Sequence, residues 1–163
     1  MLIGILSDTH DRIDALVIAL HMLRGRNVEH YIHCGDVGGG QRVLDQLAGL
    51  PVTFIWGNND WDVAALEDYA AGLGLSCGGR FVELTLGGKS FAVTHGDDSA
   101  LKKRVLDGQQ HDYLLLGHSH VYADQRVGRT RIINPGALHR ASPKTVAVLD
   151  TELDRVERIV VAP

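Results

Sequence analysis

The sequence predicts an α/β protein in which two mixed sheets pack face to face with helices outside, a four-layer α-β-β-α sandwich. Two observations support this prediction. In the first half, short apolar runs alternate with segments of helical periodicity, which is typical of parallel strands joined by right-handed crossovers. In the second half, apolar runs come in pairs separated by tight turns, which indicates hairpins. We interpret residues 1–163 as one domain, because this length supports a sizeable core but is short for two domains.

The first half contains three strand–helix pairs. The predicted strands are Leu2–Leu6, Tyr31–Cys34 and Val52–Trp56. The predicted helices span about Arg12–Arg24, Gln41–Leu50 and Trp61–Leu73, where apolar residues recur every three or four positions. Asp11 precedes the first helix and Asp60 precedes the third, so we expect both carboxylates to cap these helices.

The second half contains three hairpins, one further strand and one helix. The predicted hairpins pair Phe81–Leu86 with Lys89–Thr94, Gln125–Val127 with Thr130–Ile133, and Val146–Asp150 with Val156–Val161. Between them, Tyr113–Leu116 is a predicted strand and Ala100–Asp107 a short predicted helix. Asp97 and Asp98 stand just before this helix and are expected to cap it. Ser76–Gly79 is expected to be a loop.

The composition limits the class of function. Apolar residues make up 45% of the chain and charged residues 22%, as in ordinary globular proteins. A net charge of −4 and a pI near 6.1 give no broad basic surface, so we expect no stable binding to nucleic acid. No apolar run approaches the roughly 20 residues that span a bilayer, and no segment resembles a signal peptide. We therefore expect no membrane association and a cytoplasmic location, while the oligomeric state stays open.

Polar clusters follow five of the predicted strands. The clusters are Asp8-Thr9-His10, Gly35-Asp36, Gly57-Asn58, His95-Gly96 and Gly117-His118-Ser119-His120. Strand ends in an α/β sheet converge on one edge where ligands bind, so we expect these side chains to share a cavity. Carboxylate, amide and imidazole groups together suit divalent transition metals. The candidate metal ligands are Asp8, His10, Asp36, Asn58, His95, His118 and His120.

This ordered series resembles the calcineurin-like metallophosphoesterase superfamily, and the short chain is similar to its small bacterial and archaeal phosphodiesterase branch. The similarity covers positions 8–136 and includes Asn134-Pro135-Gly136, which resembles the turn that closes the domain in that branch. The resemblance implies two divalent metal ions, for which manganese is favoured, while iron, nickel and zinc suit the same donors. The implied ligands are Asp8, His10, Asp36 and His120 for one ion, and Asp36, Asn58, His95 and His118 for the other. Asp36 is the expected bridge, because a carboxylate has two oxygens and can contact both ions.

The resemblance also implies an activity, that of a dinuclear metal-dependent phosphodiesterase that hydrolyses small-molecule phosphodiesters through a metal-bridging hydroxide. Asp36, Asn58 and His10 are the expected catalytic residues. Two ions bring four positive charges, and two aspartates and one hydroxide remove three, so a net charge of about +1 would attract a phosphate. A phosphomonoesterase and a non-catalytic interaction scaffold remain alternatives, but the complete ligand set favours the enzyme.

The other residues that could carry chemistry are expected to be structural. His21, His30, His111 and His139 lie outside the strand-end clusters and are expected to be solvated or core histidines. Burial explains His33 and Cys34, which lie in or directly after a strand. Trp56 and Trp61 flank the Asn58 loop, where an aromatic side chain can wall a pocket, but core positions are expected for both. The run Lys102-Lys103-Arg104 is expected to be a solvated helix face.

Asn59 generates a prediction about leaving groups. In the superfamily that the chain resembles, the position after the asparagine ligand is often a histidine that can protonate the leaving oxygen. Asn59 cannot release a proton near neutral pH, so diesters with poor alkoxide leaving groups should react slowly. An Asn59→His variant should hydrolyse such diesters faster than the wild type in steady-state assays. An unchanged or lower rate would contradict this interpretation.

Overall fold

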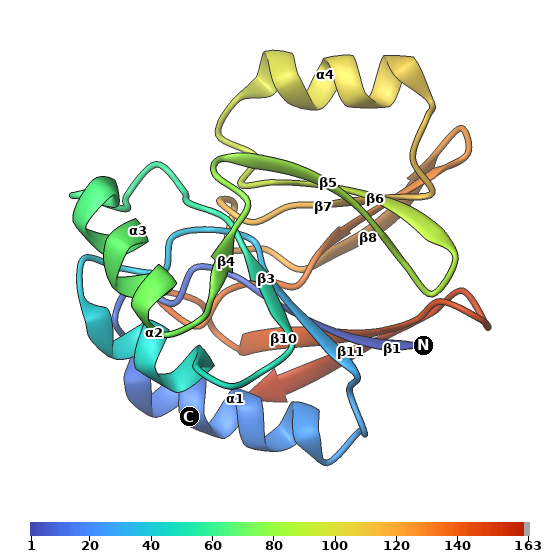
Figure 1. Ribbon diagram of the computed structural model, residues 1–163. Helices are drawn as coiled ribbons and strands as arrows, with labels where there is room; N and C mark the ends of the chain where they lie inside the picture. Colours follow the sequence, from blue (N-terminus) through green and yellow to red (C-terminus); the bar gives the residue numbers. More distant parts are fainter. Residues whose placement is uncertain (162–163) are drawn as a thin grey trace.

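Two β-sheets lie face to face at the centre of the molecule, and helices cover their outer faces (Figure 1). The computed structural model describes residues 1–161. Helix α4 (Ser99–Gly108) covers one sheet, and α1 (Ile13–Arg24), α2 (Gln41–Leu47) and α3 (Val63–Gly72) cover the other. The predicted α-β-β-α order is therefore confirmed. None of the helices within these residues has the length and apolar character needed to cross a membrane.

The first sheet has the strand order β11-β10-β1-β2-β3-β4. Its parallel strands are β1 (Leu2–Leu6), β2 (His30–His33), β3 (Val52–Phe54) and β4 (Ser76–Cys77). The hairpin of β10 (Lys144–Asp150) and β11 (Arg155–Val161) joins this sheet antiparallel to β1. Strand β4 was expected to be a loop, which was wrong. It is an edge strand of two residues, too short to show a period of hydrophobicity.

The second sheet has the strand order β5-β6-β7-β9-β8. Its strands are β5 (Phe81–Leu86), β6 (Lys89–Thr94), β7 (Tyr113–Leu115), β8 (Ala123–Val127) and β9 (Thr130–Asn134). The two predicted hairpins, β5-β6 and β8-β9, form its edges, while β6, β7 and β9 run parallel at its centre. Both sheets are thus mixed, as predicted.

Successive apolar side chains of the central strands point to opposite faces of each sheet, so both faces are packed. In β1, Ile3 and Ile5 face the second sheet, whereas Leu6 packs against the helices. In β7, Leu115 faces the first sheet and Leu114 packs beneath α4. Strands buried on both faces appear in the sequence as continuous apolar runs, which is why these strands were recognisable. Their carboxyl ends lead directly into the polar clusters.

Two of the predicted helix caps are wrong. Helix α1 begins only at Ile13 and α3 only at Val63, and no side chain caps the first turn of either helix. Asp11 and Asp60 therefore lie too far from these helix ends to act as caps. The cap of α4 is confirmed for Asp98, whose carboxylate accepts a hydrogen bond of 2.9 Å from the backbone N–H of Leu101. Asp97 receives no such bond.

An ion-pair cluster joins the two sheets at the end of the strands away from the polar clusters. Asp154, in the turn between β10 and β11, accepts hydrogen bonds of 2.9 Å from the Tyr113 hydroxyl and from the Arg131 guanidinium. Its other oxygen accepts one of 2.5 Å from Arg126. Burial raises the pKa of Asp154, but the bonds from Arg131 and Tyr113 lower it more, so the net pKa lies below the usual value.

An Asp154→Ala variant should lower the free energy of unfolding at pH 7 by about 1 kcal/mol, because bonds to a charged group are lost but a half-exposed side chain is screened by solvent. A depressed folded-state pKa contributes stability above the unfolded value of about 3.9, and this stability is lost as the pH falls below it. In urea unfolding experiments, the difference in free energy of unfolding between the wild type and Asp154→Ala should be smaller at pH 3.5 than at pH 7. Glu152→Ala, in the same turn, is the matched control, and an equal effect of both variants would contradict the prediction.

Candidate metal centre

The seven candidate ligands come together at the carboxyl ends of strands from both sheets. The first sheet supplies Asp8 and His10 after β1, Asp36 after β2 and Asn58 after β3. The second sheet supplies His95 after β6, and His118 and His120 after β7. Backbone hydrogen bonds tie these loops together, from His10 N–H to Asp36 O (3.1 Å) and from Gly117 N–H to His95 O (2.9 Å). Neighbouring loops are therefore tied together within each sheet.

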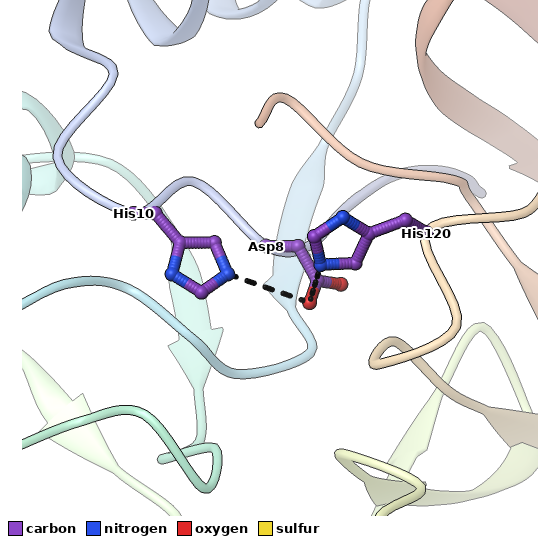
Figure 2. Close-up of side chains that lie close together, drawn as sticks. All are labelled: Asp8, His10 and His120. Atoms are coloured by element: carbon purple, nitrogen blue, oxygen red, sulfur yellow. Dashed lines mark ion pairs between the residues drawn. The ribbon is translucent and has the colours of Figure 1, made fainter. Parts of the chain in front are cut away.

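Asp8 lies between two histidines, as Figure 2 shows. Its Oδ1 is 3.1 Å from Nε2 of His120 and 3.9 Å from Nε2 of His10. Its Oδ2 accepts a hydrogen bond of 3.1 Å from the backbone N–H of His118. The Asp8 side chain is fully buried. One carboxylate oxygen is thus held by the backbone, and the other faces two imidazole nitrogens.

Asp36 lies between His10 and His95. Its Oδ2 is 3.4 Å from Nε2 of His10 and 3.2 Å from Nε2 of His95, and His95 Nε2 is also 4.0 Å from Asp8 Oδ1. Two groups result, each with its ligand atoms within 4.8 Å of one another: Asp8, His10 and His120, and Asp8, Asp36 and His95. Asp8 is common to both groups, whereas Asp36, the expected bridge, belongs to one group and lies close to His10 of the other.

The donor atoms of this cluster fit a divalent cation. Asp8 Oδ1, His10 Nε2 and His95 Nε2 are buried and have no hydrogen-bond partner. Leaving such atoms unsatisfied costs about 1–3 kcal/mol each, a cost that a metal ion removes. Nδ1 of His95 lies 2.8 Å from the Cys34 carbonyl, which can only accept a hydrogen bond. Nδ1 therefore carries a ring proton, which leaves Nε2 as the nitrogen that would bind a metal.

Electrostatics keep Asp36 ionised. Burial raises the pKa of Asp36, but the neighbouring His95 and two hydrogen bonds from Asn59 outweigh burial and bring it below the usual value. These bonds run from the Asn59 backbone N–H to Oδ1 and from Nδ2 to Oδ2, each of 2.8 Å. Burial lowers the pKa of His95, yet the proximity of Asp36 and Cys34 O raises it more, so the net pKa of His95 is raised. The carboxylate is thus available as an anionic ligand, and Asn59 positions it.

Asn58 and His118 form the outer part of the cluster. Asn58 Oδ1 lies 3.1 Å from Nδ1 of His118, and the His118 ring packs edge-on against His95 with 5.2 Å between ring centroids. Both Asn58 and His118 are exposed, unlike the buried carboxylates. This pair therefore lies on the solvent side of His95.

The backbone at this site is strained. Five of the seven candidate ligands have a positive φ: Asp8 (53°), His10 (43°), Asp36 (54°), His118 (65°) and His120 (57°). This region is costly for residues other than glycine, although Asp and His tolerate it better than most, and it persists mainly at functional sites. Glycines leave space for the carboxylates. A Cβ at Gly57 would lie 2.2 Å from Asp36 Oδ1, and one at Gly117 would lie 2.8 Å from Asp8 Oδ2.

Asp11 and Asp60 bind loop backbone rather than helix ends. The buried Asp60 accepts hydrogen bonds from the N–H groups of Gly38 (2.8 Å) and Gly57 (2.7 Å), and so connects the loops after β2 and β3. Asp11 accepts bonds from the N–H groups of Gly39 (3.1 Å) and Gly40 (3.3 Å). In the sequence, Asp11 and Asp60 stand close to candidate ligands as well as before helices. The structure shows that their closeness to the ligands, and not to the helices, indicates what they bind.

The Asn134-Pro135-Gly136 turn holds the loop that carries His118 and His120. The Asn134 side-chain amide donates to the carbonyl of Gly117 over 2.6 Å, and its oxygen accepts a bond of 2.9 Å from Gly136 N–H. The turn after β9 is thereby attached to the loop after β7. The sequence pattern identified this turn, and the structure gives it a positioning contact at the site.

A cavity of about 560 Å³ opens over the cluster. Its eleven lining residues are His10, Asp11, Asp36, Gly38, Gly39, Asn59, Trp61, His118, His120, His139 and Arg140. The core position expected for Trp61 is wrong, because the residue lies in the loop before α3 and is 69% exposed. It lines the cavity instead, which agrees with the alternative of a pocket wall. Trp56 is buried as predicted.

The histidines outside the clusters take different positions. His139 was given no role, yet its ring lies against that of His10, with 4.9 Å between centroids. Its loop follows the predicted strand Thr130–Ile133, but the Asn134-Pro135-Gly136 turn separates His139 from the strand end, so it was not part of a strand-end cluster. His21, His30 and His111 do not line the cavity. His33 and Cys34 are buried as predicted, and burial lowers the pKa of His33 to about 3.

Comparisons with known proteins agree with this geometry. The family model for the calcineurin-like phosphoesterase superfamily domain matches residues 1–154. The phosphodiesterase MJ0936 of Methanocaldococcus jannaschii is 28% identical over 165 residues, which cover 98% of this chain and 99% of the relative. The solved structure of an archaeal phosphodiesterase superposes with a TM-score of 0.90 at 27% identity, over 98% of this chain and 99% of that one. The phosphoesterase Yfce of E. coli shares the fold, with a TM-score of 0.71 at 17% identity over 99% and 100% of the two chains.

A Gly57→Ala variant should weaken metal binding by about 10- to 100-fold, because the added Cβ displaces Asp36 from the cluster. The control is Gly39→Ala at the rim of the same cavity, where a Cβ meets nothing within 4 Å. Equilibrium dialysis against Mn²⁺ with elemental analysis measures the affinity, and circular dichroism checks the fold. Equal affinity of the two folded variants would contradict the steric role of Gly57.

Proposed function

The chain belongs to the calcineurin-like phosphoesterase superfamily, and on this premise we propose that it is a dinuclear metal-dependent phosphodiesterase acting on small phosphodiesters. The observation that carries the proposal is the buried Asp/His cluster, in which Asp8 Oδ1, His10 Nε2 and His95 Nε2 lack partners. The similarity in sequence and in structure to archaeal phosphodiesterase along nearly the whole chain supports a diester as substrate. A cytoplasmic location stays a prediction.

Each candidate ligand has a proposed place. Asp8, His10, Asp36 and His120 would hold one divalent ion, and Asp36, Asn58, His95 and His118 would hold the other. Manganese is favoured, and iron, nickel and zinc suit the same nitrogen and oxygen donors. When bound, two such ions polarise the phosphoryl oxygens and make hydroxide available as a nucleophile near neutral pH.

The chain itself supplies orientation and charge. Asp8 and Asp36 provide two buried negative charges, which the backbone N–H of His118 and the side chain of Asn59 hold in place. Cys34 O fixes the ring of His95 through Nδ1. Because these partners are present before any substrate binds, the cluster needs little reorganisation during the reaction. His10 and Asp36 also line the cavity, where a substrate phosphate would approach.

Activity after metal removal and reloading tests the proposal. Metal-stripped protein should be inactive, and after addition of Mn²⁺ it should hydrolyse bis(p-nitrophenyl) phosphate faster than p-nitrophenyl phosphate. Asp36→Asn should lower kcat/KM by at least about 100-fold, because the central carboxylate loses its charge. Asp107→Asn, on the exposed face of α4, is the matched control. Absence of hydrolysis would favour the scaffold, and faster monoester hydrolysis would favour the phosphomonoesterase.

The contact between Asn59 and Asp36 sharpens the leaving-group test. Asn59→His removes the amide that holds Asp36 Oδ2, and so does Asn59→Ala, but only the histidine adds an acid. The rate of Asn59→His divided by the rate of Asn59→Ala should therefore be larger for an alkyl phosphodiester than for an activated aryl diester. Equal ratios on both substrates would show that the lost contact, and not proton donation, decides the rate.

A further inference from the structure

Trp61 is an exposed aromatic side chain at the rim of the cavity. It is 69% exposed and lines the same cavity as His10 and Asp36. By contrast, Trp56 is buried, and its indole N–H donates a hydrogen bond of 3.0 Å to Glu67. No described residue receives a hydrogen bond from the Trp61 indole. Such an exposed ring offers a flat surface for stacking against a planar group of a ligand.

Arg140 is the second feature of the rim. It is exposed and is the only arginine or lysine among the eleven residues that line the cavity. Within residues 1–161 it forms no salt bridge. Asp11 lines the same cavity, but its carboxylate binds the N–H groups of Gly39 and Gly40 and forms no ion pair with Arg140. The φ of Arg140 is 45°, a costly conformation of the kind that persists in ligand-binding loops.

The size of the cavity indicates a ligand larger than phosphate. Its volume of about 560 Å³ lies within the range of sites for small organic molecules, roughly 300–1,000 Å³. The candidate metal ligands His10, Asp36, His118 and His120 line this cavity together with Trp61 and Arg140, which lie on the loops before α3 and before β10. Arg140 is the single arginine or lysine that lines this cavity, and the chain has a net charge of −4. This does not suit a long nucleic-acid strand, whose phosphates need a row of basic side chains.

We propose that Trp61 stacks on the base of a nucleoside-containing phosphodiester and that Arg140 binds a second phosphate on that nucleoside. This inference rests on the proposed phosphodiesterase function and names the substrate class of the same cavity. The reacting phosphate lies at the metal cluster, the base lies on Trp61, and the guanidinium pairs with the additional anion, a geometry for which arginine is well suited.

Three substrates with one leaving group test the proposal in the manganese-loaded enzyme. They are thymidine 5′-(p-nitrophenyl phosphate), the same ester with a 3′-phosphate, and methyl p-nitrophenyl phosphate. The wild type should prefer the first over the methyl ester and the second over the first. Trp61→Ala should lower kcat/KM for the thymidine esters about 10-fold, mainly through KM, and change it less than about 2-fold for the methyl ester. Trp61→Phe should retain most of the preference.

Arg140→Gln should abolish the preference for the 3′-phosphorylated ester, and Arg140→Lys should restore part of it. Arg104→Gln removes the same charge from α4, outside this cavity, and should have no effect. Equal losses on all three substrates would indicate a merely structural role and overturn the proposal. A wild type that does not distinguish the methyl ester from the thymidine esters would also overturn it.

A binding measurement separates this inference from the proposed function. If the wild type hydrolyses none of the three esters, the phosphodiesterase proposal fails, and calorimetric titration with thymidine 3′,5′-bisphosphate still tests the rim. Binding that is tighter than that of inorganic phosphate, and weakened by both Trp61→Ala and Arg140→Gln, supports the assignment. Binding that neither variant changes overturns it.

Discussion

The structure depends on two buried carboxylates that no arginine or lysine neutralises. The ion-pair partners of Asp8 and Asp36 within residues 1–161 are all histidines, namely His10, His95 and His120. Buried charge without a full counter-charge is expensive, so the surrounding loops must hold these groups in place against their tendency to separate or protonate. The amide of Asn59, the backbone N–H of His118 and the glycines that leave room for both carboxylates do this.

A second set of contacts makes those loops rigid. Asp60 joins the loops after β2 and β3 through two glycine N–H groups, and Asn134 joins the loops after β7 and β9. The strained backbone of the candidate ligands is tolerated because such contacts fix it from several sides. The cost of an unfavourable φ and of unsatisfied donors is thus concentrated in a few residues, while the two sheets beneath them are regular and apolar.

The layers, the helices and the family could be predicted from the sequence, because continuous apolar runs and polar clusters at their ends are local signals. Features that depend on tertiary contacts could not. The edge strand β4 has two residues and no period, and Asp60 resembles a helix cap until its contacts with Gly38 and Gly57 are seen. Trp61, His139 and Arg140 reach the cavity from loops whose paths no local pattern encodes. The candidate ligands were recognisable because residue type and order identify them, whereas their supporting residues are ordinary polar side chains.

The insertion of β10 beside β1 has a consequence for biosynthesis. Leu2 is paired with Asp150 and Ile5 with Ala147, so the strand that carries the first two candidate ligands obtains one of its neighbours from the far end of the chain. Pairings between such distant segments form late, since a long loop must close first. A chain still emerging from the ribosome has made Asp8 and His10 long before their strand can be enclosed on both sides. The first candidate ligands to be synthesised therefore belong to a strand that is completed only after β10 has been made.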